Sequence, residues 1–129
     1  MSDATLAEPT VLAEVSGGIG RLVLNRPKAL NALDLGMIRA LSEALEAWRA
    51  DPAVRLVTIE GAGGRAFCAG GDVRAIRDNV LRGDAAASEA FFASEYRLNR
   101  MIAEYPKPYV ALIDGISMGG GMGLSIHGS

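Results

Sequence analysis

Residues 54–72 read Val-Arg-Leu-Val-Thr-Ile-Glu-Gly-Ala-Gly-Gly-Arg-Ala-Phe-Cys-Ala-Gly-Gly-Asp, and this stretch decides the fold. Its first six residues, 54–59, are rich in apolar and β-branched side chains and predict a strand. Residues 61–71 are too rich in glycine for regular structure, and a short helix is predicted to begin near Asp72. A strand that leads through such a loop into a helix is typical of α/β proteins.

Upstream of this stretch, the sequence predicts a hairpin and an amphipathic helix. The β-rich runs 11–15 and 19–24 flank residues 16–18, a short loop with two glycines, which predicts the hairpin. Asp34 is the predicted N-cap of a helix that continues to about Ala50. Apolar side chains recur along that helix every three or four residues and predict one buried face: Ile38, Leu41, Leu45 and Trp48.

Downstream, the sequence predicts a long helix and a further buried strand. Asp84 is a suitable N-cap for a helix over about 85–104, and residues 109–113 predict the strand. The side chains expected to point inward from the helix are Phe91, Leu98, Met101, Ile102 and Tyr105. Residues 114–115 predict a turn, and residues 119–126 are expected to open another helix. This alternation predicts an α/β fold with parallel pairing.

The composition excludes several classes of protein. Of the 129 residues, 50% are hydrophobic and 22% are charged, which excludes a disordered tail and predicts one domain. A net charge of −2 gives no sign of a nucleic-acid or membrane partner, and no apolar run is long enough to span a bilayer. The single cysteine, Cys68, excludes an internal disulfide. Together with an N-terminus that lacks a signal-peptide pattern, it predicts a cytoplasmic location.

Two glycine clusters, 68–72 and 118–123, carry the candidate chemistry. Each follows a β-rich run and precedes a predicted helix. Glycine lets backbone N–H groups approach a ligand without an intervening β-carbon, and the N–H groups at a helix N-terminus are unpaired. One cluster alone is better explained by tight packing, but two matched clusters favour a function. Two such N–H groups can hold a developing oxyanion.

Other motifs indicate weaker alternatives. Residues 61–66 fit a loose dinucleotide fingerprint, but residues 67–71 intervene before the helix, so the match is attributed to chance. Residues 115–119 fit the G-x-S-x-G pattern around a nucleophilic Ser117. The one histidine, His127, lies ten residues further on, roughly 15 Å along a helix, and cannot reach that hydroxyl. One cysteine and one histidine also cannot build a metal site.

Three motifs, in order along the chain, resemble the crotonase (enoyl-CoA hydratase/isomerase) superfamily. They are residues 24–33 (LNRPKALNAL), 66–72 (AFCAGGD) and 114–121 (DGISMGGG). The resemblance covers about residues 10–129 and leaves residues 1–9 as an expected flexible N-terminus. It implies a spiral of ββα units, of which this chain is expected to be a truncated, N-terminal part.

Within the superfamily, residues 91–99 and 107–128 look most like the 3-hydroxyisobutyryl-CoA hydrolases of valine catabolism. This implies an acyl-CoA thioester substrate and no separate cofactor, since coenzyme A is part of the substrate. The oxyanion donors implied are the N–H groups of Gly71 (or Ala69) and Gly120 (or Gly121). The other substrate-binding residues implied are Lys28, Ala29 and Leu30 at the nucleotide, with Gly70, Asp72 and Glu95. By residue type alone, Glu95 would face solvent.

The sequence departs from the superfamily at one place that matters for the reaction. Hydratases carry a catalytic glutamate where this sequence has Gly123, which argues against addition of water to an enoyl group. The carboxylates of the hydrolases are expected beyond Ser129, so the 129-residue chain alone is expected to be inactive. The alternatives are an enoyl-CoA hydratase or isomerase, a serine peptidase like the Clp protease subunit that uses Ser117, and a non-catalytic CoA-binding fragment. A homo-oligomer is also compatible with the resemblance.

Overall fold

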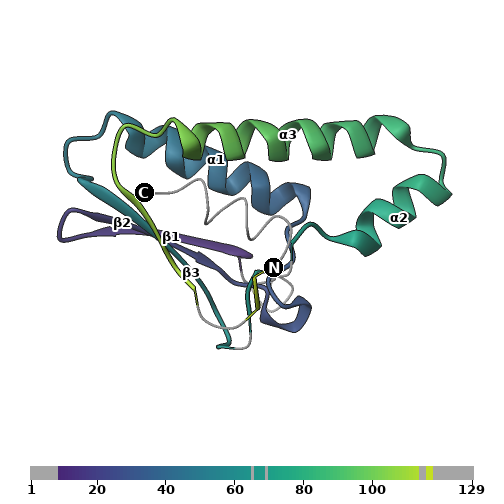
Figure 1. Cartoon of the computed structure of the whole chain (residues 1–129), viewed down its shortest axis with the longest axis horizontal. Helices are drawn as coiled ribbons and strands as arrows, with labels where there is room; N and C mark the ends of the chain where they lie inside the picture. The colour runs from purple at the N-terminus through teal and green to yellow at the C-terminus, as the bar shows by residue number, and fades with distance from the viewer. Residues whose placement is uncertain (1–8, 65, 69, 114–115, 118–129) are drawn as a thin grey trace, which may run out of the picture.

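The computed structural model describes residues 9–64, 66–68, 70–113 and 116–117. A four-stranded sheet in the order β1-β2-β3-β5 forms one layer, and α1 and α3 lie together along one of its faces (Figure 1). The strands are β1 (Val11–Ser16), β2 (Ile19–Leu24), β3 (Leu56–Gly61), β4 (Ala66–Cys68), β5 (Tyr109–Leu112) and β6 (Ile116–Ser117). The helices are a 3-10 turn (Pro27–Ala29), α1 (Leu35–Arg49), α2 (Val73–Leu81) and α3 (Ala85–Ala103).

The predicted hairpin and the predicted parallel pairing are both present. β1 pairs antiparallel with β2 around Gly17 and Gly18, whose φ angles of 60° and 82° are typical of a two-residue hairpin turn. β2, β3 and β5 then pair in parallel. The sheet is therefore mixed, as an α/β fold that begins with a hairpin requires.

The glycine-rich stretch contains one strand that the sequence did not predict. Residues 61–71 were expected to lack regular structure, but Ala66, Phe67 and Cys68 form β4 and are buried. β4 pairs in parallel with β6, with Cys68 opposite Ser117. A three-residue strand has too short a pattern to be seen in sequence, and its pairing partner lies about fifty residues away. β3 also starts two residues later than expected, at Leu56.

The three α-helices begin where the sequence predicted. The side chains of Asp34, Asp72 and Asp84 each accept a hydrogen bond from the backbone N–H three residues further on. These are N-caps, which satisfy donors that the first helical turn leaves unpaired. The 3-10 turn over Pro27–Ala29 was not predicted. Within the described residues, no helix is long and apolar enough to cross a membrane.

The core lies between the sheet and the helices. The predicted buried face of α1 is confirmed, because Ile38, Leu41, Leu45 and Trp48 are at most 8% exposed. The predicted inward side chains Phe91, Leu98 and Ile102 of α3 are buried. Met101 and Tyr105, which lies just beyond the end of α3, are partly buried and pack against the same cluster. The opposite face of the sheet carries no helix of the described chain, and Leu112 there is 49% exposed.

Some predictions fall outside the described residues. The expected turn at 114–115, the expected helix over 119–126 and most of the expected flexible segment 1–9 are in this group. They stay predictions.

Candidate active site

The turn between β2 and α1 packs against the segment that joins β3 to α2, and Asn31 lies between them. Asn31 is fully buried and adopts a left-handed conformation with φ 57°, which asparagine tolerates better than most residues. Its amide Nδ2 donates to the carbonyl oxygens of Ala62 (3.0 Å) and Ala66 (2.9 Å), and its Oδ1 accepts from the N–H of Arg26 (2.8 Å). One side chain therefore joins the ends of β2 and β3 to the start of β4.

The backbone of Leu33 fixes the two peptides that flank Gly71. The Leu33 N–H donates to the Gly70 carbonyl (2.7 Å), and the Leu33 carbonyl accepts from the Asp72 N–H (2.8 Å), which forms a parallel bridge to Gly71. Because a trans peptide is planar, the Gly71 N–H points opposite to the Gly70 carbonyl, and so away from Leu33. Nothing in the described part of the chain accepts a hydrogen bond from it. Gly71 therefore offers a fixed backbone donor that no described residue accepts from.

Asp72, which follows Gly71, is held by two different elements. Its Oδ1 accepts from the N–H of Ala75 (3.1 Å), and its Oδ2 lies 2.8 Å from Nη1 of Arg26. The same guanidinium nitrogen donates to the carbonyl of Ala32 (3.1 Å). Burial alone would raise the pKa of Asp72, but the Ala75 N–H and the Arg26 guanidinium together lower that pKa below its usual value. Asp72 is therefore ionised near neutral pH and anchors the start of α2.

Helix α3 covers the other side of Gly71. A β-carbon added at Gly71 would lie 3.2 Å from the ring of Phe91 and 3.8 Å from Oε2 of Glu95. Glu95 is half-buried, and burial raises the pKa of its carboxyl. The structure thus places Glu95 beside Gly71 rather than fully in solvent, next to the donor with which the resemblance grouped it.

Cys68 is buried, as expected for a structural thiol. Burial raises the pKa of Cys68 to about 11, and its Sγ accepts a hydrogen bond from the N–H of Gly70 (3.4 Å). The thiol is therefore protonated near neutral pH, and thiolate chemistry is not expected from it.

The stretch that the resemblance assigned to the CoA nucleotide forms one rim of a shallow depression. Lys28 and Ala29 belong to the 3-10 turn, and Leu30 follows in a left-handed conformation with φ 53°. A depression of about 270 Å³ is lined by Lys28 and Ala29 together with Arg26, Ala32, Asp72 and Arg74. Three cationic side chains and one carboxylate make this rim positive, which suits phosphate groups.

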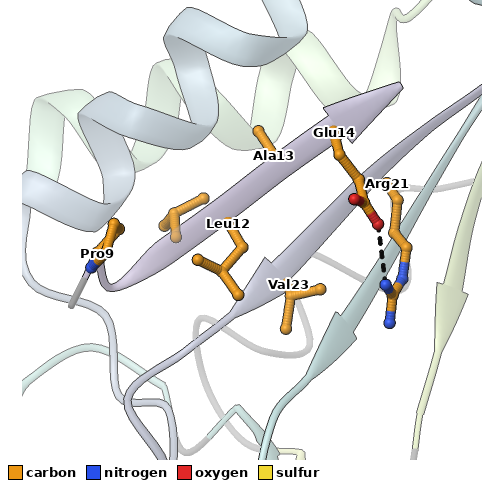
Figure 2. Close-up of a pocket in the computed structure, with 7 residues that line it drawn as sticks. Pro9, Leu12, Ala13, Glu14, Arg21 and Val23 are labelled. Carbon is orange, nitrogen blue, oxygen red and sulfur yellow. Dashed lines mark hydrogen bonds and ion pairs between the residues drawn. The ribbon is translucent and has the colours of Figure 1, made fainter. Parts of the chain in front are cut away.

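A larger depression of about 610 Å³ lies over the β1–β2 hairpin (Figure 2). Arg21 lies at its side and pairs with Glu14 (3.0 Å) and Glu60 (2.6 Å). Its cation is neutralised by these two carboxylates. Because none of the predicted site residues lines this depression, we do not assign the site to it.

The second glycine cluster can be placed only through β6. Ala69, Gly120, Gly121 and His127 lie outside the described residues. The register of β4 and β6 sets Ser117, the residue before that cluster, opposite Cys68, the first residue of the other. The chain therefore reaches the two clusters from two neighbouring strands, β4 and β6, as the oxyanion hypothesis requires. No group of three His, Cys, Asp or Glu side chains within the described ranges is placed to hold a metal ion.

The sequence did not single out the residues that hold the Gly71 segment: Arg26, Asn31 and Leu33. The one usable signal was Asn31, since asparagine in a turn is a candidate for the left-handed conformation and for bonds to backbone. The ion pair between Arg26 and Asp72 spans 46 positions and leaves no local pattern.

Comparisons with known proteins identify the family. The family model of enoyl-CoA hydratase/isomerase matches residues 19–129. The mitochondrial 3-hydroxyisobutyryl-CoA hydrolase of Xenopus tropicalis is 55% identical over 128 residues, which is 99% of this chain and 33% of that protein. The human protein of the same name is 51% identical with the same coverage.

Solved structures show the same fold. A carnitinyl-CoA dehydratase from Mycobacterium thermoresistibile superposes with a TM-score of 0.91 at 51% identity, over 95% of this chain and 36% of that one. An enoyl-CoA hydratase from Rhodobacter sphaeroides 2.4.1 superposes with a TM-score of 0.89 at 45% identity, over 93% and 36%. The crotonase-like fold predicted from the motifs is thus confirmed.

The chain spans about a third of the length of the curated relatives it matches. One prediction is wrong: the relatives from frog, rat and human are all named as mitochondrial proteins, which contradicts the cytoplasmic location. A single cysteine suits any reducing compartment, so it does not distinguish the cytoplasm from a mitochondrial location.

Proposed function

Because the chain belongs to the enoyl-CoA hydratase/isomerase family, we propose that the full-length protein carrying it hydrolyses 3-hydroxyisobutyryl-CoA. Residues 10–129 would supply the N-terminal part of its acyl-CoA-binding domain. The observation that supports this most is the Gly71 N–H, which is fixed by Leu33 on both sides and bonded to no described residue. The choice of 3-hydroxyisobutyryl as the acyl group rests on the names of the relatives reported above.

In the proposed reaction, water adds to the thioester carbonyl and the carbonyl oxygen gains negative charge. The Gly71 N–H donates to that oxygen, and from the resemblance the Gly120 N–H is the second donor. The C–S bond then breaks, the acyl group leaves as the carboxylic acid, and coenzyme A leaves as the thiol once it has taken up a proton. A preorganised donor accelerates such a step because it strengthens as the charge develops.

Lys28, Ala29 and Leu30 are proposed to hold the nucleotide end of coenzyme A at the positive depression, with Glu95 at the acyl end. Ala69, Gly70 and Asp72 are proposed to contribute backbone beside the Gly71 donor. No metal is needed for this chemistry.

An enoyl-CoA hydratase or dehydratase is the second candidate, because two solved structures of similar sequence carry those names. Against it, a glycine at position 123 leaves no carboxylate where hydratases place one. Family membership favours CoA chemistry over the peptidase alternative.

Two assays on the full-length protein separate these functions. With 3-hydroxyisobutyryl-CoA, a hydrolase releases free thiol, which a thiol-reactive dye detects. With a straight-chain 2-enoyl-CoA, a hydratase removes the enoyl absorbance and releases no thiol. We expect thiol release from the first substrate and no change in the second. Loss of enoyl absorbance without thiol release would favour the hydratase, and inactivity with both substrates would favour a non-catalytic CoA-binding protein.

A further inference from the structure

Four interactions converge on residues 66–72 from the turn that precedes α1. Asn31 binds the carbonyl of Ala66, Leu33 makes two backbone bonds around Gly71, and Arg26 pairs with the Asp72 carboxylate. The turn itself is closed by Arg26, whose carbonyl accepts from the N–H of Asn31 (2.9 Å) and whose N–H donates to the Asn31 side chain (2.8 Å). Arg26 thus holds both the turn and the far end of the segment.

The ion pair acts at a sensitive place in the chain. Asp72 is the residue after Gly71 and the N-cap of α2, so its position sets the plane of the peptide that follows the donor. The Arg26 and Asp72 side chains are only 30% and 14% exposed, and the guanidinium also binds the carbonyl of Ala32. A part-buried, multiply bonded ion pair is stronger and more directional than an exposed one.

We propose that Arg26 is a positioning residue for the oxyanion donor. Through Asp72 and the turn, it holds the Gly71 N–H in the direction that the transition state requires. The proposal rests on the function proposed above. It differs from a substrate-binding role, which the position of Arg26 at the rim of the positive depression would also allow.

Steady-state kinetics of the full-length protein separate the two roles. In Arg26→Met, a misaligned donor lowers kcat by on the order of 10- to 100-fold and leaves KM for the acyl-CoA within about twofold. Arg26→Lys keeps the charge beside Asp72 but loses the planar fork, so we expect it to recover part of kcat. A raised KM with unchanged kcat would overturn the proposal in favour of a phosphate contact.

Arg21→Met is the matched control. Like Arg26, which lies 2.8 Å from Asp72 and 4.0 Å from Asp34, Arg21 pairs with two carboxylates, but it lies on the sheet face away from the helices. Its loss is expected to leave kcat per folded molecule unchanged. Equal losses of kcat in Arg21→Met and Arg26→Met would show a general effect on stability and overturn the proposal.

A double-mutant cycle tests whether Arg26 acts through Asp72. Asp72→Asn keeps an N-cap for α2 but removes the charge. If the ion pair is the route, Arg26→Met lowers kcat much less in the Asp72→Asn background than in the wild type. Fully additive losses would contradict this route.

Amide hydrogen exchange tests the positioning role of Arg26 independently of the proposed function. A wild-type protein without thioesterase activity would overturn the function. In that case, faster amide exchange over residues 66–76 in Arg26→Met than in Arg21→Met would still support the positioning role, and equal exchange would overturn it.

Discussion

Gly71 is the residue on which the candidate site depends, because its N–H is fixed in direction and bonded to no residue that the structure describes. We expect Gly71→Pro to delete this donor and lower kcat by on the order of 10²–10³, roughly 3–4 kcal/mol of transition-state stabilisation. KM should change much less, since the carbonyl oxygen gains its charge only in the transition state. The measurement is kcat of the full-length protein, normalised to its folded fraction.

Gly71→Ala is the control for this change, because alanine retains the N–H. Its β-carbon would lie 3.2 Å from the Phe91 ring, so the ring must shift by a few tenths of an ångström. We therefore expect a lower melting temperature but a far smaller loss of kcat than in Gly71→Pro. If proline and alanine reduce kcat equally, the donor role of Gly71 is wrong and packing explains this glycine.

Glu95 gives a pH-dependent prediction at the same scale. Burial raises the pKa of Glu95 in the folded protein above its unfolded value of about 4.3. Below that unfolded value both states are protonated and burial costs nothing. As the pH rises through the folded pKa, the carboxylate must ionise in a part-buried place, and stability is lost.

We therefore expect Glu95→Gln to raise the free energy of unfolding at pH 7 and to leave it unchanged near pH 3.5. Chemical unfolding at both pH values measures this. Glu89→Gln is the control, since Glu89 is exposed on the same helix and its replacement should have little effect at either pH. Stabilisation that is equal at both pH values would show that the charge is not its cause.

At the scale of elements, carbonyl groups at the C-terminal end of α1 accept hydrogen bonds from two residues far along the chain. The ammonium of Lys107 donates to the carbonyls of Trp48 and Asp51, and the hydroxyl of Tyr105 donates to the carbonyl of Leu45 (2.6 Å). A cation at a helix C-terminus satisfies free carbonyls and opposes the helix dipole. These bonds fix the connection between α3 and β5 against α1.

We expect Lys107→Met to lower the free energy of unfolding by about 1.5–3 kcal/mol, because two carbonyls lose a charged donor. Lys28→Met is a matched control for stability, since Lys28 is the other lysine of the chain and is exposed. It should change stability by less than about 0.5 kcal/mol. Similar values for the two variants would mean that the Lys107 bonds contribute nothing measurable.

The contrast between the helices and the site shows what the sequence could predict. Asp34, Asp72 and Asp84 cap helices through bonds to residues three positions away, and such local signals can be read from sequence. β4 and the direction of the Gly71 N–H depend on partners such as Ser117 and Leu33, which are 49 and 38 positions away. Glycine spacing therefore predicted that a donor exists in this loop, whereas only the bridge to Leu33 shows where Gly71 points.

At the scale of the whole molecule, the two faces of the main sheet differ. One face carries the core under α1 and α3 (Figure 1). The other presents side chains such as Leu12, Val110 and Leu112 that are 38–49% exposed. On this second face, Arg21 pairs with Glu14 and Glu60 and supplies the polar part of the surface. Sheets with parallel strands are generally covered on both faces, so this apolar surface calls for a cover.

We expect the 129-residue chain by itself to bind a hydrophobic dye such as ANS in its native state, because β1 and β5 each expose large apolar side chains on this face. The double variant Val110→Thr and Leu112→Thr places β-branched threonines, which suit a strand, at both positions and should reduce native-state dye fluorescence about twofold or more. Leu81→Thr is the comparison, because Leu81 is 77% exposed on α2, away from the sheet. If Leu81→Thr reduces the fluorescence more than the double variant does, the dye reports the α2–α3 surface instead. A monomer that melts cooperatively and binds no dye would show that the sheet face needs no cover, and would remove the physical argument that this chain forms part of a larger domain.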